Sequence, residues 1–574
     1  MKKFRELLDQ HHKVLSLDTG LSGKLLLTTP ELNKGSAFTH EERVQFNLVG
    51  KLPAHVETLE EQAKRHYQQY LLLPTNLAKN KYLNSLRQHN NVAFFNLVSQ
   101  HLDEMLPIVY TPTIGDAVKN YSFQFDSPRG LHFSFEEADN VEMMINSISY
   151  PKVDLIVISD GEGVLGIGDW GAGGVDICVG KAMVYTLCGG VNPRRILPIQ
   201  IDVGTNNKKL LDDPMYLGWH HPRIVGEEYD QFIKLVFDAI LKKFPNIFIH
   251  CEDFGISNAR KILKQYRDKI CLFNDDIQGT GATALACVLS GLKLTGGKLP
   301  EQRFVIFGAG TAGVGIADQL LYALQNHGLT LEQAYRCFWL IDRDGLIIED
   351  MSGLRDFQAP YARPAHEWLG RDTAVPVSLL SVIEKIKPTV LIGSSAVAGA
   401  FDQPVISAMT ESVPRPMIFP LSNPNSRVEA TPQDIYNWSK GKAIVATGSP
   451  FGDVEYEEKK IRISQCNNAF IFPGIGLGVI ACGAKRVTDR MITHAALALA
   501  DCSPLSHDPD GSLLPSFSRA HSVSKMVALA VAQAAAEDGV ASIQPDVDYV
   551  QRIESIYWEP EYLPYHFKPE LMHE

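Results

Sequence analysis

The spacing of apolar positions divides the chain into regions with different predicted secondary structure. In the first 120 residues, apolar positions recur three and four apart over 57–70 and 79–106, which predicts helices. The pattern then changes to a continuous apolar run at 153–159, VDLIVIS, which is typical of a buried parallel strand. Similar runs at 196–202 and 247–251 are separated by a helical pattern. This alternation predicts β-α-β units that share a parallel sheet.

A second block of alternating strands and helices follows, before the pattern becomes helical again over 486–538. We therefore expect an α/β protein with four parts: a helical N-terminal part (1–120), a parallel-sheet domain (121–279), a second α/β domain (280–470), and a helical C-terminal part with a tail (471–574). The apolar runs that predict strands of the second block lie at 304–307, 338–341, 389–392, 417–419 and 443–446.

Composition and charge exclude several classes of protein. The 574 residues carry a net charge of −12 without a cluster of basic side chains, which argues against nucleic acid as a partner. The longest uncharged apolar stretch, 468–484, contains five Gly or Pro residues, so we expect no membrane span. The N-terminus lacks the apolar core of a secretory signal, and the nine cysteines form no C-x-x-C pair. A cytoplasmic protein with reduced thiols is the resulting expectation.

The glycine pattern at Gly308, Gly310 and Gly313 has the context of a dinucleotide-binding loop. It follows the predicted strand RFVIF directly and opens a helical pattern, so the N–H groups of the helix N-terminus would face a pyrophosphate. The next predicted strand ends in Asp342, an acid suited to a ribose 2′-hydroxyl. This predicts a Rossmann-type NAD-binding domain, although Arg343 leaves NADP open because an arginine there can receive a 2′-phosphate.

A second glycine pattern, GIGDWG at 166–171, lacks that context. It begins several residues after its strand and runs into further glycines, and Asp169 would place a negative charge where phosphate should lie. We expect its glycines to let the backbone fold tightly around something small. Lys181 is expected at the start of the helix that follows.

Acidic residues follow two predicted strands of the first sheet. Glu252 and Asp253 come after IFIHC, and Asp276 follows CLFN. Carboxylates at the carboxyl ends of parallel strands lie where open α/β sheets bind ligands, and oxygen-only ligation suits Mg²⁺ or Mn²⁺. The residues alone leave an alternative open, in which Asp276 caps its helix and Glu252 pairs with a lysine. The adjacent His220 and His221 are interpreted as loop residues rather than metal ligands.

Longer motifs in this chain resemble the malic enzymes and run in that family's order from about residue 31 to 535. The resemblance implies NAD and a divalent metal as cofactors, and L-malate as a substrate that is oxidised at C2 and then decarboxylated. The part 121–279 would be the catalytic domain, and the family is typically dimeric or tetrameric. The motifs are YTPTIG at 110–115, DGE-x-x-LGIGD at 160–169, GK at 180–181, EDF at 252–254, FNDDIQGTG at 273–281, PLSNP at 420–424 and NNAFIFPG at 467–474.

The resemblance also implies roles for single residues. Lys181 would take the proton of the 2-hydroxyl, with its pKa lowered toward the working range by burial and the metal, and Asp275 would hold its ammonium form. Tyr110 would protonate the enolate carbon after CO₂ leaves. Asn423 and Asn468 match positions that hydrogen-bond the substrate carboxylates, and Asn423 would also lie at the cofactor. Glu252, Asp253 and Asp276 would be the metal ligands.

One position departs from the family pattern. Most malic enzymes have D-G-E-R, whose arginine clamps a substrate carboxylate, but here the motif ends in Gly163. Together with Trp170 and Asp176, this stretch resembles the malolactic branch, which converts L-malate to L-lactate and CO₂ while NAD is recycled internally. We therefore expect malolactic decarboxylation, with a changed carboxylate pocket at Gly163 and Asp176. The alternatives are an NAD-dependent malic enzyme that releases pyruvate and NADH, and, more remotely, a non-catalytic metabolite or nucleotide sensor.

Overall fold

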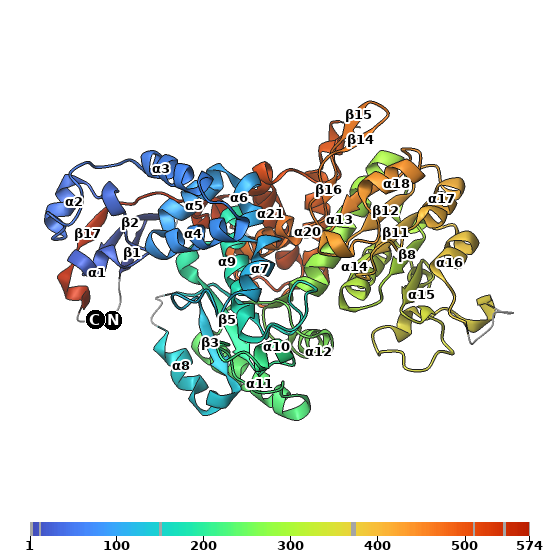
Figure 1. The fold of residues 1–574 in the computed structure, drawn as a ribbon, viewed down its shortest axis with the longest axis horizontal. Helices are drawn as coiled ribbons and strands as arrows, with labels where there is room; N and C mark the ends of the chain where they lie inside the picture. Colours follow the sequence, from blue (N-terminus) through green and yellow to red (C-terminus); the bar gives the residue numbers. More distant parts are fainter. Residues whose placement is uncertain are drawn as a thin grey trace.

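The computed structural model contains two parallel sheets that are joined by helices from the C-terminal part of the chain (Figure 1). It describes residues 4–10, 13–148, 152–368, 375–508, 511–543 and 547–572. The predicted α/β class with a helical C-terminal part is confirmed. The boundaries of the four parts stay predictions.

The first sheet has five parallel strands in the order β3-β5-β4-β6-β7. All five residues of the central strand β4 are buried, because helices cover both faces of the sheet. Leu155 packs in one core with helix α9 (Val175–Gly189), whereas Ile156 packs in another with α11 (Gly226–Lys243), as the alternation of side chains along a strand requires. The strands are β3 (Leu131–Ser134), β5 (Ile196–Asp202), β4 (Leu155–Ser159), β6 (Phe248–Cys251) and β7 (Leu272–Asn274).

The second sheet has seven strands in the order β10-β9-β8-β11-β12-β13-β16. Only β10 runs antiparallel to its neighbour, and the first six strands follow the strand order of a Rossmann fold. Helix α14 (Thr311–Asn326) leaves β8 at once, as the glycine pattern predicted. The strands are β8 (Phe304–Phe307), β9 (Phe338–Asp342), β10 (Gly345–Leu346), β11 (Val390–Gly393), β12 (Met417–Pro420), β13 (Ile444–Thr447) and β16 (Ser464–Gln465).

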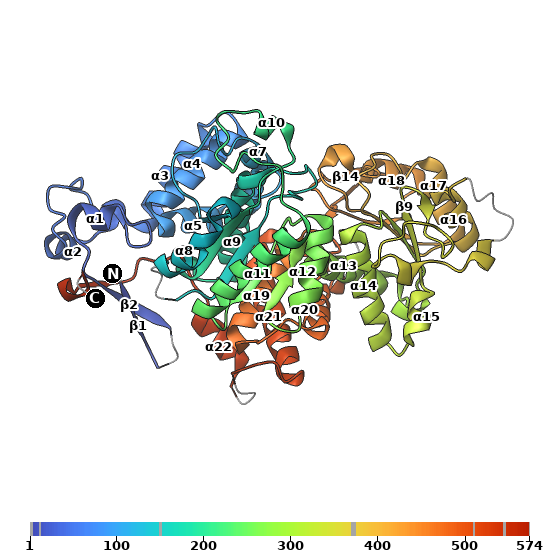
Figure 2. The ribbon, with the colours of Figure 1, turned by 90° about the horizontal axis from the view of Figure 1, so that it is seen from below.

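The N-terminal part is helical but also contains strands that the sequence pattern did not predict. β1 (Arg5–Leu8) and β2 (Val14–Thr19) form a small sheet with β17 (Tyr565–Phe567), so both ends of the chain meet there (Figure 2). The helical stretch predicted over 79–106 is divided, because the Asn90 side chain accepts a hydrogen bond from the N–H of Ala93 and starts a new helix. The helices there are α3 (Leu59–Leu71), α4 (Asn76–His89), α5 (Asn91–Gln100), α6 (Leu102–Val109) and α7 (Thr113–Lys119).

The C-terminal helices lie between the two sheets in both views (Figures 1 and 2). α19 (Phe472–Cys482) packs on α9, and α20 (Asp489–Asp501) packs on α13 (Thr280–Thr295), so these helices join the two domains in one hydrophobic core. α21 (Ala520–Glu537) covers both α19 and α20. Within the described ranges, every helix is too short or too polar to cross a membrane.

Candidate active site and metal centre

The predicted metal ligands meet where two neighbouring strands end. β6 and β7 run parallel and pair Cys251 with Asn274, so the residues after each strand lie side by side. The N–H of Asp253 donates a hydrogen bond of 2.9 Å to Oδ2 of Asp276. Carboxylate oxygens of Glu252, Asp253 and Asp276 all lie within 4.8 Å of one another. The alternative that the residues left open had two parts. The first, a capping role for Asp276, is wrong, because Asn274 is the capping residue. The second is correct, because Glu252 pairs with Lys181.

The positive charge of Lys181 balances these three carboxylates only in part. Burial, together with repulsion from neighbouring carboxylates, raises the pKa of Asp253 and of Asp276 well above the usual value. Burial also raises the pKa of Glu252 to about 7. Oδ2 of Asp253 is buried and has no hydrogen-bond partner among the described residues. A set of oxygen donors with one unsatisfied atom and mutual repulsion fits a divalent cation such as Mg²⁺ or Mn²⁺.

Lys181 is buried between two of the acids. Its Nζ forms an ion pair with Asp275 and lies 3.0 Å from Oε1 of Glu252. Burial alone would lower the pKa of Lys181, but attraction by Asp275 and Glu252 outweighs it, so the pKa lies well above its usual value. The neighbouring side chains therefore raise the pKa of Lys181, whereas the resemblance implied a lowered one. Lys181 also lies inside α9 rather than at its start, because the glycine-rich residues 171–174 form only one 3-10 turn before α9 begins.

Tyr110 and Phe472 bring distant parts of the chain to this lysine. Tyr110 follows the last residue of α6, and its ring centre lies 5.4 Å from Nζ of Lys181. Burial raises the pKa of Tyr110 well above its usual value, so its hydroxyl keeps its proton. Phe472 comes from α19, and its ring centre lies 4.4 Å from the same Nζ. The catalytic candidates Tyr110, Lys181 and Asp275 thus form one buried group.

Residues 163–165, directly before GIGDWG, pack against a metal-ligand candidate. The N–H of Gly163 donates to the carbonyl oxygen of Asp253 at 2.9 Å, and the N–H of Leu165 donates to Oδ1 of Asp253 at 3.1 Å. A Cβ at Gly163 would lie 2.9 Å from the carbonyl oxygen of Phe254. The backbone approach therefore leaves no room for the arginine side chain of the family pattern at this position.

Asp176 is engaged in a buried ion pair. Both of its oxygens accept hydrogen bonds from Nη1 of Arg129, at 3.2 and 3.3 Å, and both side chains are almost fully buried. Burial raises the pKa of Asp176, and the Arg129 guanidinium opposes that rise. The carboxylate of Asp176 is thus committed to Arg129, and the role that the sequence suggested for it in a substrate pocket stays a prediction.

The dinucleotide loop has the expected form. Gly308 has a φ of +107°, and a side chain there would collide with the carbonyl oxygen of Ser394. A Cβ at Gly310 would meet no described atom within 4 Å, so the backbone there is open to a ligand. Gly313 packs against the carbonyl of Gly308, which requires glycine. Gly308 thus allows the tight turn, Gly310 leaves space for a ligand at the backbone, and Gly313 allows the helix to pack closely on the loop.

The side chains around this loop include one that sequence reasoning missed. Nε2 of Gln358 donates hydrogen bonds of 2.8 Å to Oδ2 of Asp342 and to the carbonyl oxygen of Ala309. Arg343 is exposed beside Asp342. Gln358 lies in an irregular segment sixteen positions after Asp342 (358 − 342), and no periodicity marks it.

The two predicted substrate amides differ in their surroundings. Nδ2 of Asn468 donates to Oδ2 of Asp275 at 3.1 Å and to Oγ1 of Thr280 at 3.0 Å, so it lies beside the lysine pair. Asn423 is exposed, and its Oδ1 accepts a hydrogen bond from Ser449. The carbonyl oxygen of Asn423 would lie 3.5 Å from a Cβ at Gly166, which places it against the GIGDWG loop.

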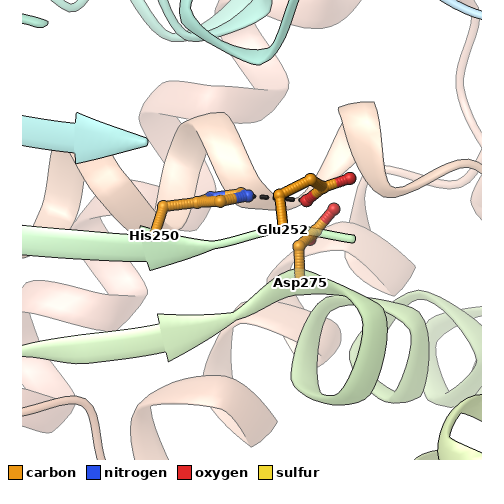
Figure 3. Close-up of side chains that lie close together, drawn as sticks. All are labelled: His250, Glu252 and Asp275. Carbon is orange, nitrogen blue, oxygen red and sulfur yellow. Dashed lines mark hydrogen bonds and ion pairs between the residues drawn. The ribbon is translucent and has the colours of Figure 1, made fainter. Parts of the chain in front are cut away.

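Figure 3 shows a further site residue that the sequence reading missed, His250. Nε2 of His250 lies 2.8 Å from Oε2 of Glu252, and both side chains point into the same space as Asp275. His250, Glu252 and Asp275 form a second group with possible metal-ligand geometry. Burial lowers the pKa of His250 to about 3, so the ring is neutral. The signal was available, because residues two apart on a strand face the same side of the sheet.

Two other expectations concern groups away from this centre. The ring of His221 stacks on Trp219, and Nε2 of His220 lies 2.9 Å from the carbonyl oxygen of Tyr216, so both histidines are loop residues as expected. All nine cysteines are free, and eight are buried.

Comparison with known proteins identifies the family. The family model described as "Malic enzyme, N-terminal domain" matches residues 87–267, and the one described as "Malic enzyme, NAD binding domain" matches residues 277–536. The chain belongs to the malic enzyme family. NAD-dependent malic enzymes from Sodalis glossinidius and Acinetobacter baylyi are 46% and 47% identical to it, each over 95% of this chain and 96% of the relative. NAD-dependent malic enzyme 3 of Bacillus subtilis is 46% identical over 96% of this chain and 97% of the relative.

Solved malic enzyme structures share the fold. The enzyme of Entamoeba histolytica is 22% identical with a TM-score of 0.54, and covers 88% of this chain and 89% of its own. The enzyme of Pyrococcus horikoshii is 24% identical with a TM-score of 0.53, and covers 79% and 89%. The comparisons confirm the family that the motifs indicated, but they do not show the malolactic branch.

Proposed function

We propose that the chain catalyses the oxidative decarboxylation of L-malate, in which malate and NAD give pyruvate, CO₂ and NADH. The observation that carries the proposal is the buried lysine pair with Asp275 and Glu252, in a chain about as long as relatives named NAD-dependent malic enzymes. Those relatives favour this alternative over the malolactic reaction that Gly163 and Asp176 suggested.

In this mechanism Lys181 would take the proton of the malate 2-hydroxyl while C2 loses its hydride, once the positive charge of a bound metal has lowered the lysine pKa that Asp275 and Glu252 raise. The ammonium that forms would lie between Asp275 and Glu252, and these two carboxylates stabilise it. Cleavage of the C3–C4 bond then releases CO₂ and leaves an enolate. Tyr110, which keeps its proton until then, gives it to C3, and Lys181 returns a proton to Tyr110.

NAD and the divalent metal would supply the two functions that the side chains of the site lack. NAD provides the hydride acceptor, and Mg²⁺ or Mn²⁺ provides positive charge at the hydroxyl and enolate oxygens. Gly308, Gly310 and Gly313 would hold the dinucleotide, with Asp342 at its ribose. The carboxylates of Glu252, Asp253 and Asp276 would hold the metal.

Backbone and amide groups would orient the substrate. Asn468 donates to Asp275, so it would fix that acid and reach a substrate carboxylate from the same position. Asn423, exposed opposite Gly166, would meet both substrate and cofactor. The predicted homo-oligomer and cytoplasmic location stay predictions.

Product analysis separates this reaction from the malolactic one. With L-malate, NAD and Mn²⁺, we expect pyruvate and NADH in equal amounts and no lactate. Lactate as the sole product with constant NADH would reverse the choice in favour of malolactic decarboxylation. The absence of any malate turnover, combined with NAD or malate binding, would instead indicate a sensor.

A further inference from the structure

The carboxylate of Glu252 is held from two sides by groups of different chemistry. Oε1 lies 3.0 Å from Nζ of Lys181, and Oε2 lies 2.8 Å from Nε2 of His250. All three side chains are at most 3% exposed, so water cannot replace either partner. The ion pair belongs to the proposed chemistry, but the contact with His250 has no part in it.

His250 is in turn held by a tyrosine from another element. The hydroxyl of Tyr185 lies 2.8 Å from Nδ1 of His250, and Tyr185 is fully buried. Tyr185 lies one turn after Lys181 on α9, and His250 lies on β6, two positions before Glu252, which directly follows that strand. The helix period and the strand period therefore bring both pairs to the same interface.

When Glu252 is ionised, hydrogen-bond donation along this chain runs in one direction. An ionised Glu252 can only accept, so Nδ1 of His250 is the acceptor nitrogen and the Tyr185 hydroxyl donates to it. Nε2 then carries the ring hydrogen and donates it to Glu252. The opposite tautomer would set a lone pair of Nε2 against a carboxylate oxygen. Tyr185 thus selects the tautomer that suits an ionised Glu252.

The imidazole ring is also fixed by aromatic packing. Rings of Tyr185, Phe273 and Phe472 each lie 5.5 Å from it, at interplanar angles of 83°, 64° and 78°. These contacts prevent the ring from turning away from Glu252. A neutral, buried and rigid donor can orient a carboxylate without adding charge to the site.

We propose that His250, with its tautomer set by Tyr185, is a positioning residue that orients the Glu252 carboxylate for the divalent metal. The proposal rests on the proposed function, because it takes Glu252 as a metal ligand. His250 itself would not bind the metal, since Nε2 is committed to Glu252 and Nδ1 to Tyr185.

The test measures Mn²⁺ binding to the metal-free protein without substrate, from the electron paramagnetic resonance signal of free Mn²⁺. Loss of an outer-shell partner weakens metal binding by about 10–100-fold, and we expect a loss of that size for His250→Leu. His250→Gln, whose amide can still donate to Glu252, should restore most of the affinity. Tyr185→Phe should weaken binding severalfold, because the tautomer is no longer fixed.

Kinetics give a second readout. In His250→Leu the KM for Mn²⁺ should rise while kcat at saturating Mn²⁺ stays within about twofold, because orientation of a ligand affects metal occupancy before chemistry. A merely structural role would lower kcat and thermal stability together. Tyr361→Phe is the matched control. It also removes a buried tyrosine hydroxyl, which donates a hydrogen bond of 2.8 Å to Asp318 on α14, within the dinucleotide-binding domain. This control should leave Mn²⁺ binding unchanged.

The outcomes distinguish a failure of the His250 proposal from a failure of the metal assignment on which it rests. Unchanged Mn²⁺ affinity in Glu252→Gln would overturn the metal assignment and with it the role of His250. Loss of affinity in Glu252→Gln but not in His250→Leu would overturn the positioning role alone. Equal losses in His250→Gln and His250→Leu would show that the imidazole itself binds the metal, which also overturns it. If His250→Leu does not fold, Tyr185→Phe decides, and unchanged affinity there refutes the tautomer argument.

Discussion

The backbone N–H of Leu165 donates a hydrogen bond of 3.1 Å to Oδ1 of Asp253. Together with the bond from the N–H of Gly163 to the carbonyl oxygen of Asp253, it ties residues 163–165, directly before GIGDWG, to the candidate metal centre. This region therefore positions a metal-ligand candidate through its backbone, which makes the metal centre sensitive to any side chain that pushes the two segments apart.

Gly163→Ala should disturb that contact. The added Cβ would lie 2.9 Å from the carbonyl oxygen of Phe254, and overpacking of this kind costs about 1–3 kcal/mol. We expect a lower Tm and weaker Mn²⁺ binding, measured by thermal unfolding and by titration. Gly452→Ala, where a Cβ meets no described atom within 4 Å, should change neither quantity. Tight Mn²⁺ binding in Gly163→Ala would mean that the two segments can separate freely.

Two glycines of the dinucleotide loop should respond differently to alanine. At Gly310 the added methyl has open space, so the protein should fold normally while the KM for NAD rises about tenfold, which corresponds to about 1.4 kcal/mol. At Gly308 the φ of +107° and the nearby carbonyl of Ser394 oppose any side chain, so Gly308→Ala should lower Tm. Unchanged KM in Gly310→Ala would remove the dinucleotide from this loop.

Removal of one partner of the buried pair between Arg129 and Asp176 should destabilise the fold. Asp176→Ala leaves the guanidinium buried without its main partner, and such a loss costs about 3–5 kcal/mol. Denaturant unfolding of Asp176→Ala and of Asp176→Asn would measure it, with the smaller loss expected for asparagine. A large change in product, lactate against pyruvate, without loss of stability would instead assign Asp176 to the substrate pocket.

Stabilisation by metal should depend on pH in a defined direction. The pKa of Glu252 rises on folding from 4.5 to about 7, so the metal-free folded protein retains a proton that the unfolded chain releases. Without metal, the contribution of Glu252 to the free energy of unfolding is therefore complete below pH 4.5 and is lost as the pH rises toward 7. Because Mn²⁺ competes with that proton, the rise in Tm on adding Mn²⁺ should be larger at about pH 7.5 than at about pH 5.5.

The matched variant for this experiment is Glu252→Gln, which has no proton to exchange at this position. Its Tm should respond little to Mn²⁺ at either pH. An equal Mn²⁺ response of the unmodified protein at both pH values would contradict the linkage between the metal and this carboxylate.

Tyr110→Phe should slow the final protonation. The hydroxyl is lost while the ring packing beside Lys181 remains, so kcat should fall by about 100-fold or more with Mn²⁺ affinity unchanged. Stopped-flow measurement of NADH should still show hydride transfer from malate, because that step precedes the protonation of C3. Unchanged kcat would assign the acid role to another group.

The sequence brought the candidate carboxylates together because they lie at strand ends. Glu252, Asp253 and Asp276 follow apolar runs directly, and parallel strands bring their ends together. Tyr110 could be placed only by resemblance, since nothing in helix α6 points to Lys181. The predicted position of Lys181 at the start of its helix was wrong, because the glycine-rich stretch 171–174 gave no clear helix start.

Other residues depend on contacts that no local pattern contains. Phe472 reaches Lys181 from a helix 291 positions away in sequence (472 − 181), and Gln358 reaches Asp342 from an irregular segment. His250 differs from both, because its place on the same strand face as Glu252 could have been read from the sequence.

The metal centre also falls across the division between the two family segments. Glu252 and Asp253 lie in the segment matched over 87–267, whereas Asp275 and Asp276 precede the one that begins at 277. Cofactor preference could therefore be exchanged between relatives as a module that starts at residue 277, with every metal-ligand candidate left in place. In such a chimera the exchanged module must also supply an amide equivalent to Asn468 and a ring equivalent to Phe472, because both lie beside Lys181 and its partner Asp275.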